Sequence, residues 1–328
     1  MLNSHFRLIG NSQWFLLLAA SGLMALVLGA DLPSWPKIFG VLNNAAHAPV
    51  FGVLALIVLR LLSARRWLVA ARSTDYGIAF LITVGVGGAV EFVQSFIGRD
   101  ASWGDLGTDA LGAGCALGLA AAFDWRVWRV KTRSTGRVLM AAAGLLCGLW
   151  ALYPVGEATV AYVDRAAKFP VLAQFASPFD LYFLSSRTAH LSLEPLPYSW
   201  SQPDDRESMR IDFAADLWPG VSHDEPPADW RGFSTLALDL TNPQETPLSL
   251  TVRVHDVDYV HRYEDRFNRS FRLAPLSRGV IRIPVRDIAH GPIGRELDLA
   301  RIAGLAVFEN SRKDLVGRYF YLTRIWLE

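Results

Sequence analysis

The chain has 328 residues, of which 52% are hydrophobic, and its formal net charge is only +1. The positive mean hydropathy argues against a wholly soluble protein, and the absence of a basic excess argues against a nucleic-acid partner. The two cysteines, Cys115 and Cys147, both lie in hydrophobic runs, which excludes a disulfide framework and a cysteine-based metal site.

The first half of the chain is apolar enough to lie in a membrane. Its hydrophobic runs predict five spanning helices, at about 13–30, 43–62, 77–97, 105–123 and 137–154. The first run is long for a signal-peptide core and Leu28 is unfavourable for cleavage, so we expect it to be retained. Residues 1–153 are therefore predicted to form a transmembrane domain.

Positive charge in two short loops orients these helices. The basic residues concerned are Arg65, Arg66 and Arg72 in one loop, and Arg126, Arg129, Lys131, Arg133 and Arg137 in the other. Short loops rich in Lys and Arg stay in the cytoplasm, so the N-terminus is predicted inside and the C-terminal domain outside. We therefore expect a multi-pass protein of the inner (plasma) membrane. Its C-terminal domain would be extracytoplasmic, and periplasmic in a cell with two membranes.

Six polar residues lie at the outward ends of the predicted helices: His47, Glu91, Gln94, Arg99, Asp105 and Asp109. Helical spacing of three or four residues places Glu91 with Gln94, and Asp105 with Asp109, on one face each. An ionisable group in hydrocarbon is costly, which makes each a candidate ligand-binding residue. The alternative is structural, because Arg99 could pair with Glu91 or Asp105 and lock the helices together.

These residues stand in a recognisable order. The segment His47-Ala-Pro-Val-Phe51, the pair Glu91 and Gln94, then Arg99, and the segment Asp105 to Gly112 resemble the VanZ-like membrane family over about residues 10–125. The resemblance implies a small helical bundle of the bacterial cell envelope, without naming a reaction. Two departures are that Asp109 stands where the family usually has Asn, and that Asn43 and Asn44 replace a common acidic-basic pair.

The second half changes to the two-residue period of β-strands. After a predicted linker helix at 154–179, runs at 208–213, 236–240, 248–254, 267–273, 281–285, 302–308 and 318–327 predict strands. Predicted turns at Asn242-Pro243, Pro247, Ser277-Arg278-Gly279 and Gly291-Pro292 separate them. Many short strands indicate an all-β sandwich, so residues 180–328 are predicted to be a jelly roll.

Two segments of this half carry a second resemblance. Residues 229–240 and the closing run from Tyr319 to Leu327 resemble galactose-binding-like jelly rolls, over about 185–328. Such sandwiches occur in carbohydrate-binding modules, so the resemblance implies a glycan as partner.

The segment from His255 to Phe267 is both aromatic and charged. Tyr259, Tyr263, Asp265 and Arg266 are its candidate ligand-binding residues, because aromatic faces and charged hydrogen-bonding groups suit sugar rings. The alternative is a solvated hairpin held by salt bridges. Asp256 and Asp258 lack the spacing of a calcium loop, and the sequence predicts neither a metal site nor a cofactor.

Three functions follow from these patterns. The first is binding of an envelope glycan or lipid-linked component, with membrane lipids as further partners and no nucleic acid. The second is an enzyme on a lipid-linked substrate, with Glu91 or His47 as acid or base, Arg99 on phosphate, and Asp105 and Asp109 on a divalent ion. The third is a structural membrane anchor for the β domain. Whether the chain is an enzyme stays open at this point.

Overall fold

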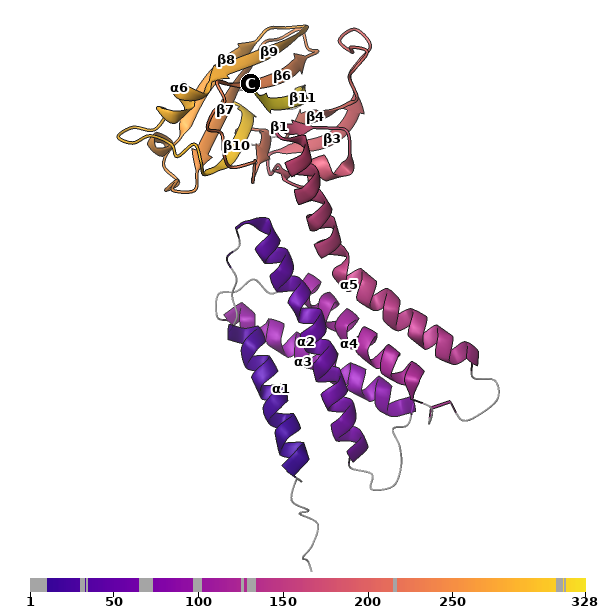
Figure 1. The fold of residues 1–328 in the computed structure, drawn as a ribbon. Helices are drawn as coiled ribbons and strands as arrows, with labels where there is room; N and C mark the ends of the chain where they lie inside the picture. The colour runs from indigo at the N-terminus through magenta and orange to yellow at the C-terminus, as the bar shows by residue number, and fades with distance from the viewer. Residues whose placement is uncertain are drawn as a thin grey trace, which may run out of the picture. The chain divides into compact units, whose positions relative to one another are not determined.

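The computed structural model describes residues 11–29, 33, 35–64, 73–96, 102–124, 127–128, 134–214, 217–310, 315 and 317–328. The chain divides into two compact units, residues 1–158 and 159–328. The first is helical and the second is mostly β-strand (Figure 1). The combination of a helical membrane region with an antiparallel β-sandwich agrees with the fold class that the sequence predicted.

The helical unit holds α1 (Asn11–Gly29), α2 (Lys37–Ala64), α3 (Ser73–Phe96), α4 (Trp103–Phe123) and the first part of α5 (Ser134–Lys168). Among the described residues, α2 to α5 are long and apolar enough to cross a membrane. The apolar part described for α1 is shorter, Gln13–Leu23. Helices α1 to α4 each match a predicted run to within six residues at either end, because continuous apolar sequence favours helices that satisfy their own backbone hydrogen bonds.

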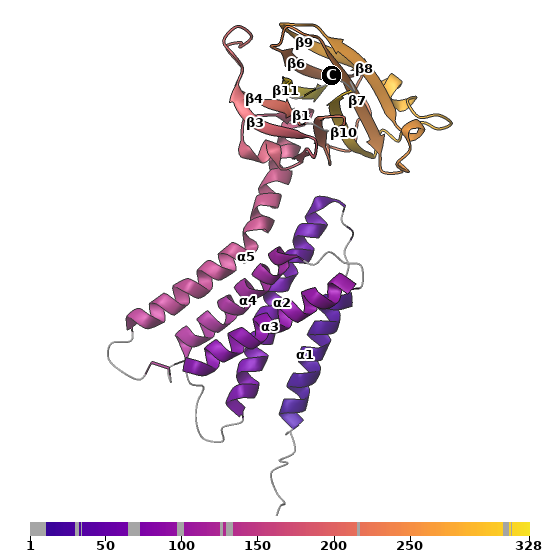
Figure 2. The ribbon, with the colours of Figure 1, turned by 180° about the vertical axis from the view of Figure 1, so that it is seen from behind.

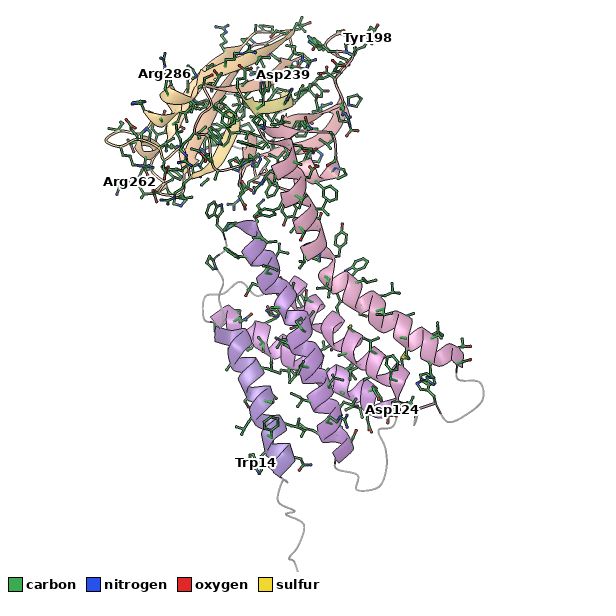
Figure 3. All side chains as sticks on the ribbon, viewed as in Figure 1. Trp14, Asp124, Tyr198, Asp239, Arg262 and Arg286 are labelled. Carbon is green, nitrogen blue, oxygen red and sulfur yellow. The ribbon has the colours of Figure 1, made fainter. Side chains whose placement is uncertain are left out.

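The surface of this unit is apolar in the way a lipid-facing surface must be. Leu81, Phe92, Leu146 and Leu149 each expose more than 60% of their area. Apolar exposure on that scale is unusual for a soluble monomer and normal for helices solvated by lipid tails. Trp14 lies at the same end of the helices as Asp124 (Figure 3), where an interfacial aromatic residue is expected.

Glycine lets α2 and α4 approach closely. A Cβ atom on Gly112 would lie 2.0 Å from the carbonyl oxygen of Ala48, and one on Gly52 would lie 3.1 Å from the carbonyl oxygen of Gly112. Backbones touch at this point because neither glycine has a side chain to separate them. The contact brings His47 on α2 next to Asp109 on α4.

Helix α5 differs from the prediction. Where the sequence predicted a span at 137–154 and a separate linker helix at 154–179, the structure has one continuous helix, Ser134–Lys168, with Pro154 inside it. The predicted boundary at residue 154 falls on Pro154, which lacks one backbone donor. Long apolar helices tolerate that loss when neighbouring groups compensate for it. The chain then enters β1 (Val171–Gln174), so residues 171–174 belong to the sandwich.

The β unit is a sandwich of two antiparallel sheets. The six-stranded sheet has the order β3 (Ala189–Pro195), β4 (Glu207–Phe213), β11 (Tyr319–Leu327), β6 (Thr235–Asn242) and β9 (Ser277–Pro284), with β1 also paired to β11. The five-stranded sheet has the order β2 (Leu184–Ser185), β5 (Gly220–His223), β10 (Ile302–Glu309), β7 (Leu248–Asp256) and β8 (Phe267–Leu273). Figure 2 shows β10, β7 and β8 of this second sheet from behind.

Alternate residues from both sheets fill the space between them. Leu236, Leu238 and Leu240 of β6 are fully buried, and so are Leu250 and Val252 of β7. The residues between them, such as Asp239 of β6 and Ser249 of β7, point away from this core, as a two-residue period predicts.

All seven predicted strands are present. The structure adds β1, β2, β3 and β5, the short helices η1 (Pro178–Leu181), η2 (Tyr263–Asp265) and α6 (Val285–Ala289), and it corrects one turn. Ser277-Arg278-Gly279 was predicted as a turn but forms the start of β9, paired with Asn242, Thr241 and Leu240. Glycine fits there because β9 lies at the sheet edge, paired only with β6.

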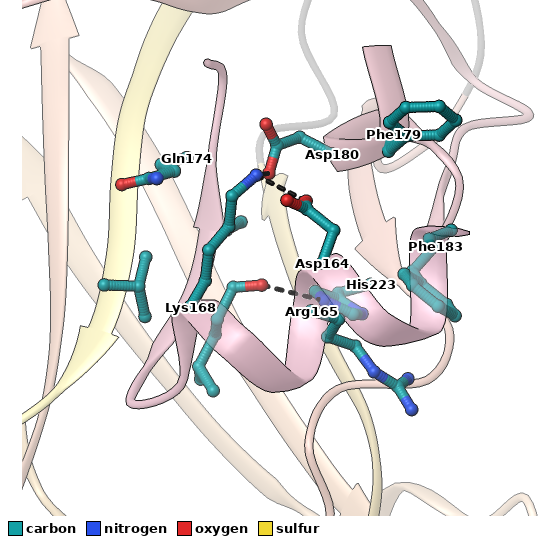
Figure 4. Close-up of a pocket in the computed structure, with 12 residues that line it drawn as sticks. Asp164, Arg165, Lys168, Gln174, Phe179, Asp180, Phe183 and His223 are labelled. Carbon is teal, nitrogen blue, oxygen red and sulfur yellow. Dashed lines mark hydrogen bonds and ion pairs between the residues drawn. The ribbon is translucent and has the colours of Figure 1, made fainter. Parts of the chain in front are cut away.

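The last turns of α5, from residue 159, are fixed to the sandwich. Lys168 donates to Asp164 at 2.5 Å and to Asp180 at 2.7 Å, and His223 Nε2 lies 3.1 Å from the Leu172 carbonyl oxygen (Figure 4). The cavity beneath them encloses only about 10 Å³, roughly the room of one water molecule. This hollow is a packing seam with no space for a ligand.

Candidate functional site

Three of the six predicted membrane residues meet in the helical unit. His47 Nδ1 lies 2.9 Å from Asp109 Oδ1, and His47, Glu91 and Asp109 each offer a ligand atom within 4.8 Å of the others. All three are at least nine-tenths buried, with exposed fractions of 8%, 7% and 0%. They come from α2, α3 and α4, so the cluster forms only when these helices pack together.

The other three members are placed less centrally. Gln94 is buried on α3, one turn after Glu91, and Asp105 is half-buried on α4, one turn before Asp109. Arg99 lies outside the described residues, and so does the ion pair predicted for it. The prediction of one shared pocket stays a prediction for Gln94, Asp105 and Arg99.

The predicted loop of the sandwich divides into structural and accessible residues. Asp265 forms an ion pair with Arg295, whose guanidinium also donates to Asp256 at 2.6 and 2.9 Å. Asp265 Oδ2 accepts a hydrogen bond from the Val260 backbone N–H at 2.8 Å. These bonds hold both carboxylates, so Asp256 and Asp265 stabilise the loop.

Tyr259, Tyr263 and Arg266 form an aromatic and cationic group in the same loop. Arg266 donates to the Tyr259 hydroxyl at 2.8 Å, and its guanidinium lies 5.7 Å from the centre of that ring and 5.5 Å from that of Tyr263. Tyr259 thus positions Arg266, whereas Tyr263 is 66% exposed. Of the four predicted loop residues, Tyr263 and Arg266 face the groove described next.

A groove of about 940 Å³ lies on the outer face of the five-stranded sheet. Its floor follows the register of the strands: Ser222, Ala306, Arg253 and Asn268 are successive cross-strand neighbours. A second row runs through Gly220, Phe308, Thr251 and Ser270. Hydroxyl, amide and guanidinium groups thus surround a half-buried aromatic ring, a combination suited to a sugar with polar edges and an apolar face.

Several groups of this groove are unpartnered among the described residues. Arg253 Nε, Arg266 Nε and Asn268 Oδ1 are buried atoms without a hydrogen-bond partner. A buried polar atom without a partner costs free energy. The side chains of Arg253, Arg266 and Asn268 also line the groove, which makes these residues candidates for contact with a ligand.

Two residues at the groove have a strained backbone. Trp218 has a φ of 56° and His261 a φ of 60°, values that bulky residues seldom adopt. Trp218 is also 51% exposed, so its indole is presented to solvent at the mouth of the groove. Strain of this kind collects at functional sites, where the fold holds a side chain in a required position.

The six-stranded sheet carries a smaller groove, of about 640 Å³. Its central cation is already neutralised: Arg278 donates to Asp239 at 2.6 Å and to Asp205 at 2.8 Å. The Arg278 guanidinium, by its hydrogen bond, holds the pKa of Asp205 below its usual range. The charged groups at its centre satisfy one another, which favours the first groove as the ligand site.

His255 lies beside the first groove and gives the sandwich a pH dependence. Burial, and then the positive charges of Arg253 and Arg266, lower its pKa to about 4, although Asp256 acts in the opposite direction. The unfolded chain would bind the proton near pH 6.5 and the folded protein only near pH 4. We therefore expect stability to fall by up to about 3 kcal/mol as pH drops through that interval, with no further loss from this group below it.

The measurement is urea unfolding of the full chain in detergent at pH 7 and pH 4.5, for the wild type and His255→Gln. The substitution removes the titrating ring, so the stability difference between the two pH values should shrink. An unchanged difference would assign the pH dependence to other groups.

The sequence alone could predict only part of the groove. Alternation along β7 marked Thr251 and Arg253 as outward-facing, but their neighbours on β5, β8 and β10 depend on register, which periodicity within one strand does not give. Trp218 lies in irregular backbone just before β5, where no periodic pattern applies.

Comparisons with known proteins concern the sandwich. No protein-family model matches the chain, and a search of curated proteins finds no match. Among solved structures, an exo-beta-agarase is similar over 48% of this chain and 24% of its own, with 15% identity and a TM-score of 0.39. A family 11 carbohydrate-binding module from Clostridium thermocellum, in complex with a mixed-linked tetrasaccharide, is 15% identical over 48% of this chain and 93% of its own (TM-score 0.35). The N-terminal CBM22-1–GH10 modules of a xylanase from the same organism match 48% of this chain and 28% of their own, with 8% identity and a TM-score of 0.34.

Proposed function

We propose that this chain is an integral membrane protein of the bacterial cell envelope that binds a glycan in the groove of its five-stranded sheet. The N-terminus is then cytoplasmic and the β-sandwich extracytoplasmic, as the basic loops favour. The helical unit is then a VanZ-like bundle, a proposal that rests on the order of His47, Glu91, Gln94 and Asp109 in the sequence.

One observation carries the proposal: the groove combines guanidinium groups with exposed aromatic rings. Arg253 and Arg266 line the groove, and so do Trp218 and Tyr263, which are 51% and 66% exposed. Sugars are bound by such pairs of features, because a ring stacks its C–H face on an aromatic side chain while its hydroxyls accept from guanidinium groups.

The charge of the groove indicates an acidic glycan. Among the described residues that line it, Arg187, Arg253 and Arg266 stand against one carboxylate, Asp224. Residues 170–328 as a whole carry 18 basic and 22 acidic residues, so this positive charge is local to the groove. A polysaccharide with carboxylate or phosphate groups would meet favourable potential there and repulsion over much of the remaining surface.

The test is binding of the full chain, in detergent, to anionic polygalacturonate and to neutral dextran. We expect Arg253→Gln to weaken binding of the anionic polymer by about tenfold to a hundredfold, because a charge-assisted hydrogen bond is lost. Trp218→Ala should weaken it by about tenfold. Added salt should weaken binding as well.

Two matched controls lie outside the groove. Arg282→Gln changes an exposed arginine of the six-stranded sheet, and Tyr198→Ala removes a ring that is 98% exposed. Figure 3 places Tyr198 at the opposite end of the sandwich from Arg262 of the groove-side loop. Equal losses in groove and control variants, or no binding of either polymer by the wild type, would exclude this groove as a glycan site of the stated class.

A second candidate function is catalysis on a lipid-linked envelope substrate. One observation favours it: His47, Glu91 and Asp109 lie close together inside the helical unit. All three side chains are able to transfer protons. Glu91→Gln separates the two functions. An enzyme would keep its ligand and lose turnover, whereas a binding protein would show no turnover in either form.

A further inference from the structure

We propose that His47, Glu91 and Asp109 bind one divalent transition-metal ion, of the zinc or manganese type, in the helical unit. The inference is independent of the glycan groove and of any reaction. It rests on the geometry of three buried side chains from three helices.

The donor set suits such an ion. One imidazole nitrogen and two carboxylate oxygens lie within 4.8 Å of one another. Metal–ligand distances of about 2.0–2.2 Å place neighbouring ligands roughly 3–4 Å apart, so small side-chain rotations would close the three on one ion. A mixed nitrogen and oxygen set favours zinc, manganese or iron over calcium and magnesium, which prefer oxygen alone.

Two carboxylate oxygens of this cluster lack a hydrogen-bond partner in the described structure. Glu91 Oε1 and Asp109 Oδ2 are buried atoms without a hydrogen-bond partner, on side chains that are 7% and 0% exposed. Two carboxylates side by side in an apolar bundle repel each other and are poorly solvated. A divalent cation would neutralise both and supply the missing contact.

Neighbouring groups hold these ligands in place. The Ser102 backbone N–H donates to Glu91 Oε2 at 2.8 Å and leaves Oε1 available. A Cβ atom on Gly87 would lie 2.7 Å from Asp109 Oδ2, so the carboxylate occupies the space that a side chain on Gly87 would need. The ring of His47 stacks on Phe51, with ring centres 6.1 Å apart. Support of this kind is what orients the ligands of metal sites.

Three protein ligands leave part of the coordination sphere open. Catalytic zinc sites have this arrangement, with water or a substrate oxygen completing the set. The exchangeable ligand here would be water or an oxygen of an anionic molecule reaching the helical unit.

The experiment measures metal content of the full chain purified in detergent without chelator, by inductively coupled plasma mass spectrometry. Stripped protein is then titrated with Zn²⁺ and with Mn²⁺ against a chromophoric chelator, with the melting temperature as a second readout. We expect one ion per chain and a rise in melting temperature on binding. Glu91→Gln and Asp109→Asn should each lower affinity at least tenfold.

A second pair of variants distinguishes loss of the metal site from misfolding. Gly87→Ala keeps every ligand but forces Asp109 to move, whereas a Cβ on Gly88 would meet nothing within 4 Å. Weaker metal binding in Gly87→Ala than in Gly88→Ala, with similar melting temperatures of the stripped proteins, supports the site. Wild-type protein without stoichiometric metal, or equal affinity in Glu91→Gln, Asp109→Asn and the wild type, overturns it.

Discussion

Replacing Gly112 by alanine is expected to separate helices α2 and α4. The added Cβ would lie 2.0 Å from the Ala48 carbonyl oxygen and 2.6 Å from its Cα, and both are backbone atoms that cannot rotate away. Overpacking usually costs about 1–3 kcal/mol, and a backbone contact belongs at the upper end. Because Ala48 follows His47, the displacement also moves His47 away from Asp109.

The control is Gly107→Ala on the same helix, where a Cβ would meet nothing within 4 Å. Alanine favours helix over glycine by about 1 kcal/mol, so this variant should be as stable as the wild type or more stable. Thermal unfolding in detergent, followed by circular dichroism at 222 nm, measures both. Similar melting temperatures for the two variants would show that α2 and α4 do not touch at Gly112.

Replacing Arg295 by alanine is expected to destabilise the β-sandwich by about 3–5 kcal/mol, because it leaves Asp256 buried without its cation. Asp256 is 1% exposed and accepts two hydrogen bonds from Arg295. Burial alone would raise the pKa of Asp256, but Arg295 and the Asp298 backbone N–H hold it below its usual range. Arg295 also binds Asp265, so the loop at 257–266 should loosen too.

Arg301→Ala is the matched control, because Arg301 pairs with Asp258 at 2.9 Å while both side chains are more than half exposed. An exposed pair contributes about 0–1 kcal/mol, so the control should unfold close to the wild type. Urea unfolding at pH 7 followed by near-ultraviolet circular dichroism distinguishes them. A loss below 1 kcal/mol for Arg295→Ala would mean that Asp256 finds another partner or water.

The sequence predicted elements where a pattern repeats over enough residues. Strands β6 and β7 alternate over eight and nine residues and were found, whereas β1, β2 and β5 have four, two and four residues, too few for a period of two to stand out. The predicted end of the fifth span at residue 154 falls on Pro154, a residue that disfavours helix interiors. The helix nevertheless continues through it to Lys168.

The two candidate sites differed in how far they could be predicted. In the membrane half, polar residues are rare, so His47, Glu91 and Asp109 stood out individually, and the predicted topology placed all three at the outward ends of their helices. In the sandwich, polar residues are common, and the loop carboxylate Asp265 resembled a ligand group although it pairs with Arg295. Arg253 could be assigned to the groove only once the register of β7 with β8 and β10 was known.

Strand β11 has a consequence for the order in which the protein can be built. It is the last strand along the chain, yet it lies between β4 and β6 and also pairs with β1. During synthesis, helices α1 to α5 leave the ribosome before any of the sandwich is made, and β3–β4 and β6–β9 can form only as separate pairs until residues 319–327 follow. The six-stranded sheet therefore closes after translation of these residues, and until then β4 and β6 present unpaired edges on which chaperones or neighbouring chains can act.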